Sequence, residues 1–335
     1  MHFIFRIFSI GFVTFTLTTT TFSQTTLAGG RGMFRVFSAQ TIQAGSIFLN
    51  SSSLSFFKAS GNDRTFNLSL TYGVTNNVEL TALAVPYQDD QKHNWGPPGD
   101  TQLGIKWRLP LASSRFSAGL RGLVILPTAL QHNAPLEPYS SDQVAWGIMG
   151  LLSFDLTNSF GQLPLKIHAN FGYLDHNIET LLSKDGTDQL LLGFGFKFSA
   201  HPFIIYTEYT GEFFLGNSAI NFGDNSMRLG QGFKFLGPFN LIVDFGLEIG
   251  LSRGLKSSPQ PLHKYADWKI FTGLAYHFKM SKVHGYAAKE TKIDRKKERK
   301  ALEALKEKRK NVDQDLKEKR KTLEKGTKKK SIKEI

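Results

Sequence analysis

The sequence predicts an all-β fold, an antiparallel transmembrane β-barrel of about 12 strands followed by a charged α-helical tail. Three observations predict it. Apolar and polar side chains alternate with a period of two in most segments between residues 46 and 278, many segments are near the ~9 to 11 residues of a membrane-crossing strand, and short connections alternate with long ones. A soluble β-sandwich or propeller also alternates, but its strands are usually shorter, about 5 to 6 residues.

The first 23 residues predict a secretory signal peptide. Arg6 gives a positive start, residues 7–17 are mostly apolar, and Ser23 is among the small residues that follow. The apolar run is shorter than the ~20 residues that a membrane helix needs, and no later segment supplies such a helix. Residues 24–45 are rich in glycine and show no long period. Two interpretations of them stay open, a periplasmic lead-in or a segment that folds into the lumen.

The alternation is clearest near the end of the barrel, where Phe239 to Leu251 places apolar side chains opposite Asp244, Glu248 and several glycines. One face therefore suits lipid and the other a polar interior. We predict strands at residues 46–58, 63–74, 77–86, 100–109, 115–126, 142–154, 164–174, 189–198, 203–213, 225–235, 239–251 and 267–278.

The connections predict the orientation of the barrel. From the second connection onward, short turns such as Thr75-Asn76 alternate with long loops such as residues 127–141. Outer-membrane barrels have short turns on the periplasmic side and longer loops outside. An even number of strands then places both ends of the barrel in the periplasm. Residues 59–62 depart from the pattern, because this outer connection is short.

Charged residues identify the inner face, because an Arg or Lys that faces lipid at mid-depth costs about 2 to 4 kcal/mol. Barrels of eight strands are filled by side chains and those of 16 to 18 hold a channel, so about twelve strands fit a narrow polar pore or a plugged lumen. The same charges could instead only brace the wall. The lumen-lining candidates are Lys106, Arg108, Arg121, Lys166, His168, Glu208, Arg228, Asp244, Glu248 and Lys269.

The sequence gives little support for catalysis or metal binding. His168 and Asn170 share the inner face, but no sequence pattern ties a serine to them as a nucleophile. Four further histidines fall one to a long loop without the local spacing of a metal site. We therefore predict no catalytic residue, no cofactor and no metal site; the loop histidines are His93, His132, His176 and His263.

The basic character of the chain belongs to its tail. Residues 279–335 hold 22 of the 41 Lys and Arg residues and 10 of the 28 Asp and Glu residues, so the rest is nearly neutral. The tail is rich in helix formers, and Leu302, Leu305 and Leu316 fit a heptad register that predicts a weak coiled coil. Two interpretations of the tail stay open. It is a solvated helix, or it is a periplasmic arm that contacts anionic cell wall or a partner. Nucleic acid is not expected, because an exported tail would not meet it.

The last predicted strand ends with the spacing of Gly273, Tyr276 and Phe278. This spacing resembles the last-strand signal by which bacterial outer-membrane barrels are recognised for assembly. The resemblance implies that the chain is inserted into outer-membrane lipid by the barrel assembly machinery.

Residues 99–110, GDTQLGIKWRLP, and residues 72–80, YGVTNNVEL, form a strand and turn pattern. It resembles that of transporter-type bacterial outer-membrane β-barrels, including those associated with phenol-degradation pathways. The resemblance implies a narrow passive channel or transporter for small solutes in the bacterial outer membrane, and it transfers no binding residue. The alternative is a structural or anchoring barrel whose basic tail contacts the cell wall or an envelope partner.

Overall fold

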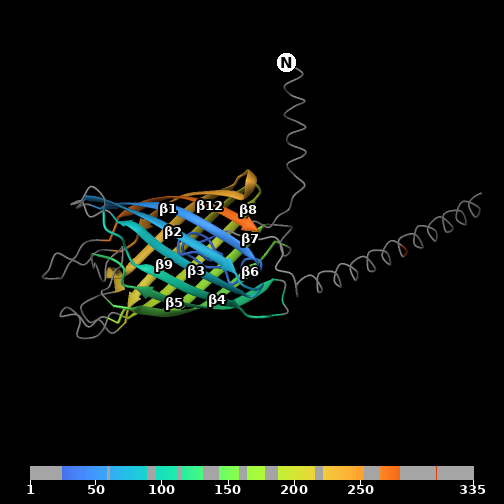
Figure 1. Cartoon of the computed structure of the whole chain (residues 1–335), viewed down its shortest axis with the longest axis horizontal. Coiled ribbons are helices and arrows are strands. Elements are labelled where there is room, and N and C mark those ends of the chain that lie inside the picture. Colours follow the sequence, from blue (N-terminus) through green and yellow to red (C-terminus); the bar gives the residue numbers. More distant parts are fainter. Residues whose placement is uncertain are drawn as a thin grey trace, which may run out of the picture. The chain divides into compact units, whose positions relative to one another are not determined.

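The protein folds as a closed antiparallel barrel in which each strand pairs with its neighbours in sequence and β1 pairs with β12 (Figure 1). The computed structural model describes residues 25–58, 61–88, 96–111, 113, 115–130, 143–157, 164–177, 188–215, 222–252, 265–279 and 307. The strands are β1 Ser46–Lys58, β2 Gly61–Gly73, β3 Val78–Gln88, β4 Thr101–Arg108, β5 Phe116–Leu126, β6 Ala145–Asp155, β7 Leu165–Asp175, β8 Gln189–Ala200, β9 Phe203–Phe214, β10 Ser226–Leu236, β11 Leu241–Gly250 and β12 Trp268–Lys279; two short 3₁₀ helices are η1 Phe222–Asp224 and η2 Pro238–Asn240.

The predicted all-β barrel is confirmed, and each strand end lies within three residues of its predicted position. The predicted signal peptide and helical tail fall outside the described residues, apart from Glu307, which is helical. None of the helices in the described part of the chain is long and apolar enough to cross a membrane.

One boundary differs for a physical reason. We expected the strand at residues 77–86 to end at Pro86, but β3 continues to Gln88. The pairing register between β2 and β3 shifts between Phe66 and Leu68, so that Pro86 sits in a bulge. A bulge tolerates proline because the extra residue is left out of the hydrogen-bond ladder.

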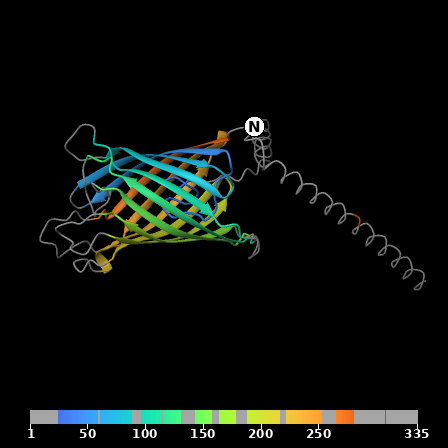
Figure 2. The ribbon, with the colours of Figure 1, turned by 60° about the horizontal axis from the view of Figure 1, so that its bottom comes forward.

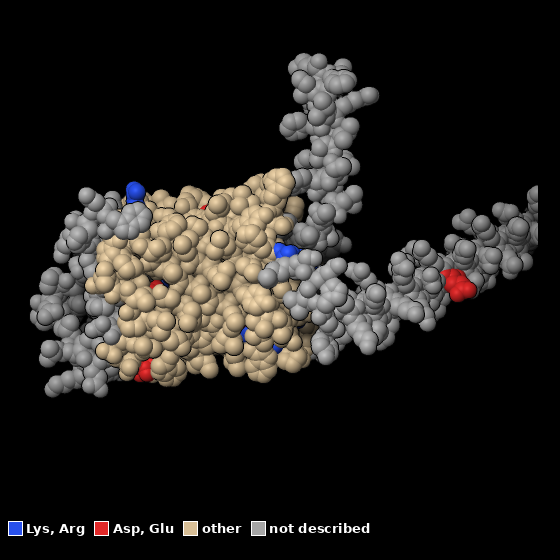
Figure 3. Space-filling model, viewed as in Figure 1, with Lys and Arg blue, Asp and Glu red and all other residues tan. Residues whose placement is uncertain are grey.

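The outer wall of the barrel is apolar. Phe171, Phe245 and Ile105 are 62%, 53% and 52% exposed, whereas the charged residues at alternate positions point inward. On the face shown in Figure 3 the wall is almost entirely free of Lys, Arg, Asp and Glu. A surface with so many exposed large apolar side chains suits lipid rather than water.

Aromatic side chains lie on this outer wall near both rims. Trp146 and Tyr173 contact each other across β6 and β7, with ring centroids 5.8 Å apart, near the rim where the long connections join the strands. Near the opposite rim, Tyr276 and Phe278 of β12 pack edge to face at 4.4 Å, and Trp107 is exposed on β4. Two aromatic belts of this kind are typical of barrels whose rims lie at the two membrane interfaces.

The strand β1 departs from the usual pattern over part of its length. Its buried inner positions include Phe48, Leu54 and Phe56, whereas Ser53 and Ser55 stand at outward positions. The inner face of β1 is apolar because it packs, together with Phe271 of β12, against an apolar cluster inside the barrel. The rule of apolar outside and polar inside therefore fails at the seam where the barrel closes.

The outward direction of Phe245 can be tested by substitution. We expect Phe245→Arg, near the middle of β11, to lower the free energy of unfolding by about 2 to 4 kcal/mol, because it places a charge at mid-membrane depth. Leu251→Arg, just beyond the end of the same strand, is the matched control and should cost about 0 to 1 kcal/mol. Urea titration of the protein folded in lipid vesicles measures both, and equal costs would contradict the assigned depth.

Candidate functional site: the occupied lumen

Residues 25–45, named here the lumen segment, lie inside the barrel (Figure 2). The segment contacts every strand of the wall. From β1 to β12 in order, the contacting wall residues include Asn50, Thr71, Glu79, Lys106, Arg121, Ser153, Asn170, Gly195, Glu208, Lys234, Glu248 and Phe271. In the structure, residues 25–45 are thus enclosed by inward-facing side chains of the wall.

Glycine lets the lumen segment turn close to the wall. Gly29 and Gly30 have φ values of 73° and 83°, which residues with side chains rarely adopt, and Thr26 Oγ1 closes the turn by donating to Gly29 O at 2.6 Å. On the facing wall, a Cβ atom at Gly195 would lie 2.0 Å from the terminal methyl carbon of Met33. The missing side chain at Gly195 thus provides the space that Met33 fills.

Lys106 and Glu79 form the first charged contact between the wall and the lumen segment. Lys106 Nζ donates to the carbonyl oxygens of Arg31 and Ser38 at 3.2 and 3.0 Å, and lies 2.5 Å from Glu79 Oε1. Glu79 in turn accepts the backbone N–H groups of Arg31 and Ile42 at 3.0 and 2.8 Å. Both charges are buried, so they satisfy each other and four backbone groups of the lumen segment.

Lys234 on β10 repeats this arrangement on the other side of the lumen. Its Nζ atom donates to the carbonyl oxygens of Thr25 and Met33 at 3.0 and 3.1 Å. Asp244 on β11 balances the charge at 2.8 Å and also accepts the hydroxyl proton of Tyr206 at 2.9 Å. Both lysines therefore combine one wall carboxylate with two carbonyl groups of the lumen segment.

Two glutamates hold the centre of the lumen segment. Glu208 accepts the backbone N–H groups of Arg35 and Val36, at 2.9 to 3.1 Å. The Arg35 guanidinium pairs with Glu248, and Lys269 lies 3.7 Å from the same carboxylate. Burial lowers the pKa of Arg35, but the adjacent Glu248 carboxylate outweighs burial and leaves the pKa above its usual value. Arg35 thus stays charged while it is enclosed.

Uncharged side chains hold residues 37–39 of the lumen segment. Asn170 accepts the N–H group of Phe37 at 2.7 Å and donates to the carbonyl oxygen of Phe37 at 2.8 Å. Ser153 Oγ accepts the N–H group of Ala39 at 2.9 Å and lies 2.7 Å from Nδ1 of His168. No sequence pattern indicated this serine and histidine pair. Both residues are buried; Ser153 binds the backbone of the lumen segment, and His168 contacts Ser153 from the wall.

The remaining lumen-lining candidates lie at the margins of the lumen segment. Lys166 pairs with Asp155 close to a strand end, and Arg108 is half-buried at the end of β4. The described residues before residue 280 include six buried lysines and arginines and four buried carboxylates, and the partly buried Asp244 and Glu212 pair with two of the six cations. The six cations are Lys106, Arg121, Lys197, Arg228, Lys234 and Lys269, and the carboxylates are Glu79, Asp100, Glu208 and Glu248.

The three residues of the expected assembly signal lie at the end of β12, where Gly273 faces the lumen and Tyr276 and Phe278 face outward. Of the loop histidines, His176 contacts Gln189 at 2.8 Å, and its burial holds its pKa below the usual value. Within the described residues, no group of His, Cys, Asp and Glu is arranged to hold a metal ion. His93, His132 and His263 lie outside those residues.

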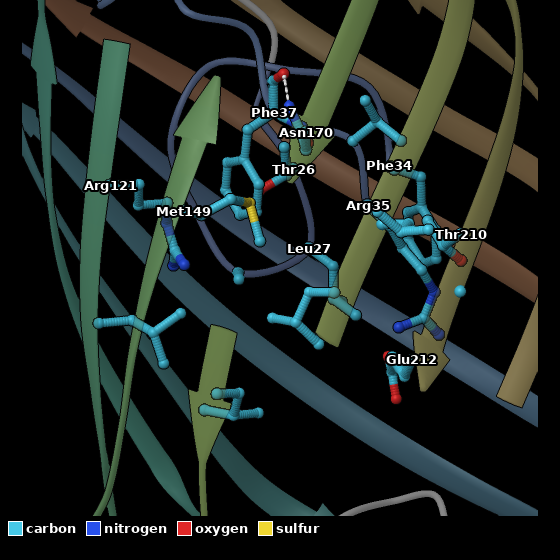
Figure 4. Close-up of a pocket in the computed structure, with 18 of the residues that line it drawn as sticks. Thr26, Leu27, Phe34, Arg35, Phe37, Arg121, Met149, Asn170, Thr210 and Glu212 are labelled. Atoms are coloured by element: carbon cyan, nitrogen blue, oxygen red, sulfur yellow. Dashed lines mark hydrogen bonds between the residues drawn. The ribbon is translucent and has the colours of Figure 1, made fainter. Parts of the chain in front are cut away.

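A cavity of about 220 Å³ remains between the lumen segment and the wall (Figure 4). Leu123, Met149 and Leu191 are among the apolar residues that line it, and Arg121 and Glu212 are among its charged residues. In Figure 4, Arg121 lies across the cavity from Arg35 and Glu212, with Leu27 between them. The strand halves that line the cavity are those nearer the long connections.

The buried pair of Lys106 and Glu79 yields a stability prediction. Lys106→Met leaves a buried carboxylate without its partner, and we expect it to lower the free energy of unfolding by about 3 to 5 kcal/mol. Combining it with Glu79→Gln should cost less than the sum of the two single changes, by about 0.5 to 3 kcal/mol, because they share one interaction. Lys166→Met breaks a more exposed pair and should cost under about 1 kcal/mol. Urea titration in vesicles measures all four variants, and strict additivity would refute the coupling.

Comparison with known proteins gives likeness in fold only. No protein-family model and no curated protein sequence matches the chain. Among solved structures, an outer membrane channel from Pseudomonas putida F1 has 10% identity and a TM-score of 0.47, and covers 72% of this chain and 98% of its own. The NanC porin has 9% identity and a TM-score of 0.47, with coverage of 69% and 98%. The KdgM porin has 9% identity and a TM-score of 0.45, with coverage of 70% and 99%. At these values the likenesses assign neither a function nor a site residue.

Proposed function

We propose that the protein is an outer-membrane β-barrel channel for small solutes, and that the lumen segment must shift before solutes pass. The observation that carries the proposal is the two-sided wall, apolar and aromatic outside but hydrogen-bonding and charged inside. A barrel that only needed a packed interior could fill it with apolar side chains. Buried charges such as Lys106 and Glu208 are costly, which favours a role that needs a wettable lumen.

The contacts of the lumen segment support a displaceable occupant. Lys106, Lys234 and Glu208 bind its backbone carbonyl and N–H groups, which water can replace without leaving a polar group unsatisfied. The segment precedes β1 directly and joins the wall at one end, where Gly45 N–H donates to Gly73 O at 2.8 Å. It can therefore leave the lumen while it stays attached to the barrel.

A reversible crosslink tests this proposal, and the chain offers a clean background because it has no cysteine. A Cβ atom at Gly193 would lie 3.3 Å from Cγ2 of Val36, which brings the lumen segment and β8 into reach of a disulfide. We expect the double variant Val36→Cys and Gly193→Cys to conduct ions in planar bilayers when reduced and to lose most conductance when oxidised. The single variants Val36→Cys and Gly193→Cys are the controls and should not respond to oxidant.

Two outcomes would contradict the proposal. If the wild type and every reduced variant give no conductance and no swelling of liposomes in graded sugars, the protein is not a channel. If the oxidised double variant conducts as well as the reduced one, solutes pass beside a lumen segment that stays in place.

A structural or anchoring barrel is the second candidate, and the filled lumen favours it. Contacts from all strands to residues 25–45 would make the barrel rigid without any solute passing through it. The basic residues 279–335 would then contact cell-wall carboxylates or an envelope partner.

Deletion of residues 286–335 separates the two functions. The channel function predicts unchanged conductance and unchanged sedimentation with purified cell wall. The anchoring function predicts that the truncated protein no longer sediments with cell wall, because most of the net positive charge has been removed.

A further inference from the structure

We propose that the lumen cavity binds a small organic acid, with the carboxylate at Arg121 and an apolar body of about one ring against the neighbouring wall. This inference rests on the proposed channel function where it names small organic acids as solutes that bind in the lumen during passage. The binding site itself does not require conduction.

The cation of the site is Arg121 on β5. Its side chain is buried, with 2% exposure, and it lines the cavity. Among the residues that the structure describes, no carboxylate, carbonyl or hydroxyl accepts a hydrogen bond from its guanidinium, and Nη2 is fully enclosed without a partner. Its close contact is the ring of Phe37, 4.2 Å from Cζ to the centroid. A buried arginine without an acceptor is costly, and a bound anion would remove that cost.

The other arginines at the cavity have carboxylate partners. Arg35 pairs with Glu248, and Arg228 Nη2 lies 3.0 Å from Glu212 Oε1. The arginines on the opposite side of the cavity are therefore paired, whereas Arg121 forms no ion pair with the residues that the structure describes. This asymmetry favours a ligand with one negative charge at one end.

The rest of the cavity suits an apolar body. Leu123, Ile125, Met149, Leu174 and Leu191 come from four adjacent strands, β5 to β8, and line one continuous side of it. A dry cavity of about 150 Å³ holds a benzene molecule. The 220 Å³ here thus has room for a single ring with a carboxylate. A sugar of the same size would leave its hydroxyl groups against leucine and methionine without partners.

Benzoate and benzyl alcohol are suitable probes, because the two have similar shape and only benzoate is charged at neutral pH. We expect isothermal titration calorimetry of the full-length protein in detergent to detect benzoate binding, and benzyl alcohol to bind at least about 10-fold more weakly. Equal binding of the two probes, or no benzoate binding at millimolar concentration, would overturn the proposal.

Three variants locate the site. Arg121→Met should reduce benzoate affinity about 10-fold or more, while Arg121→Lys should keep part of it. Leu191→Trp should abolish binding of both probes by filling the cavity without changing its charge. Lys197→Met is the matched control, since Lys197 is a buried cation on β8 outside the cavity, and it should bind benzoate normally. The thermal stability of Arg121→Met should not fall, because the change removes an uncompensated buried charge.

The experiments can refute the binding site and the channel function independently of each other. Benzoate binding that needs Arg121, in a protein that never conducts, would keep this site and refute the channel. If the protein conducts but Arg121→Met binds benzoate as well as Lys197→Met does, the site is refuted and the channel function stands.

Discussion

The interior of this barrel depends on one constraint, that the backbone of an irregular segment inside a lumen must find partners for its N–H and C=O groups. The lumen segment pairs part of its backbone with itself, in the β-bridges of Thr25 with Arg31 and of Gly32 with Phe37 and in turns such as that of Met33 N–H to Val36 O. Wall charges supply other partners: Lys106 and Lys234 each bind two carbonyl groups, and glutamates accept N–H groups. The buried charges and the segment therefore satisfy each other for as long as the segment keeps water out of the lumen.

This pairing of wall charges with the segment makes Arg121 informative. Most enclosed charges in the described part of the lumen have a clear structural use, such as the Glu208 contact with backbone or the Glu248 contact with Arg35. Arg121 has only an aromatic face beside it, at the edge of a cavity. Lys197 is also a buried cation without an ion pair among the described residues, but it lies outside the cavity, whereas Arg121 lines it. A ligand anion in the cavity would give Arg121 a partner.

The sequence predicted the wall well and its contents poorly, for the same physical reason. Strand alternation is local, so residues such as Phe245 and Asp244 reveal their faces from their neighbours alone. The lumen segment has no period, and its contacts join residues far apart, as with Val36 and Glu208, so the sequence left its place open. The inward direction of the apolar side chains of Leu54 and Phe56 could not be predicted for the same reason. These side chains pack against the lumen segment and not against lipid. Clustered glycines were the one local sign of close packing.

The balance of contacts also bears on how the lumen segment would leave. Polar contacts to Lys106, Lys234 and Glu208 exchange readily for water, whereas the stacked rings of Phe34 and Phe271, with centroids 3.7 Å apart, lose apolar contact when hydrated. Two apolar clusters lie along β1 and β12. Phe34 packs with Leu54 and Phe271 in the half away from Ser46. Ile42 packs with Phe48 and Ala275 near Ser46, where the segment joins the barrel. Displacement that begins at the polar side could keep the apolar seam intact, so a partial opening costs less than complete release. The closure of the barrel and the control of its lumen would then share the same pair of strands.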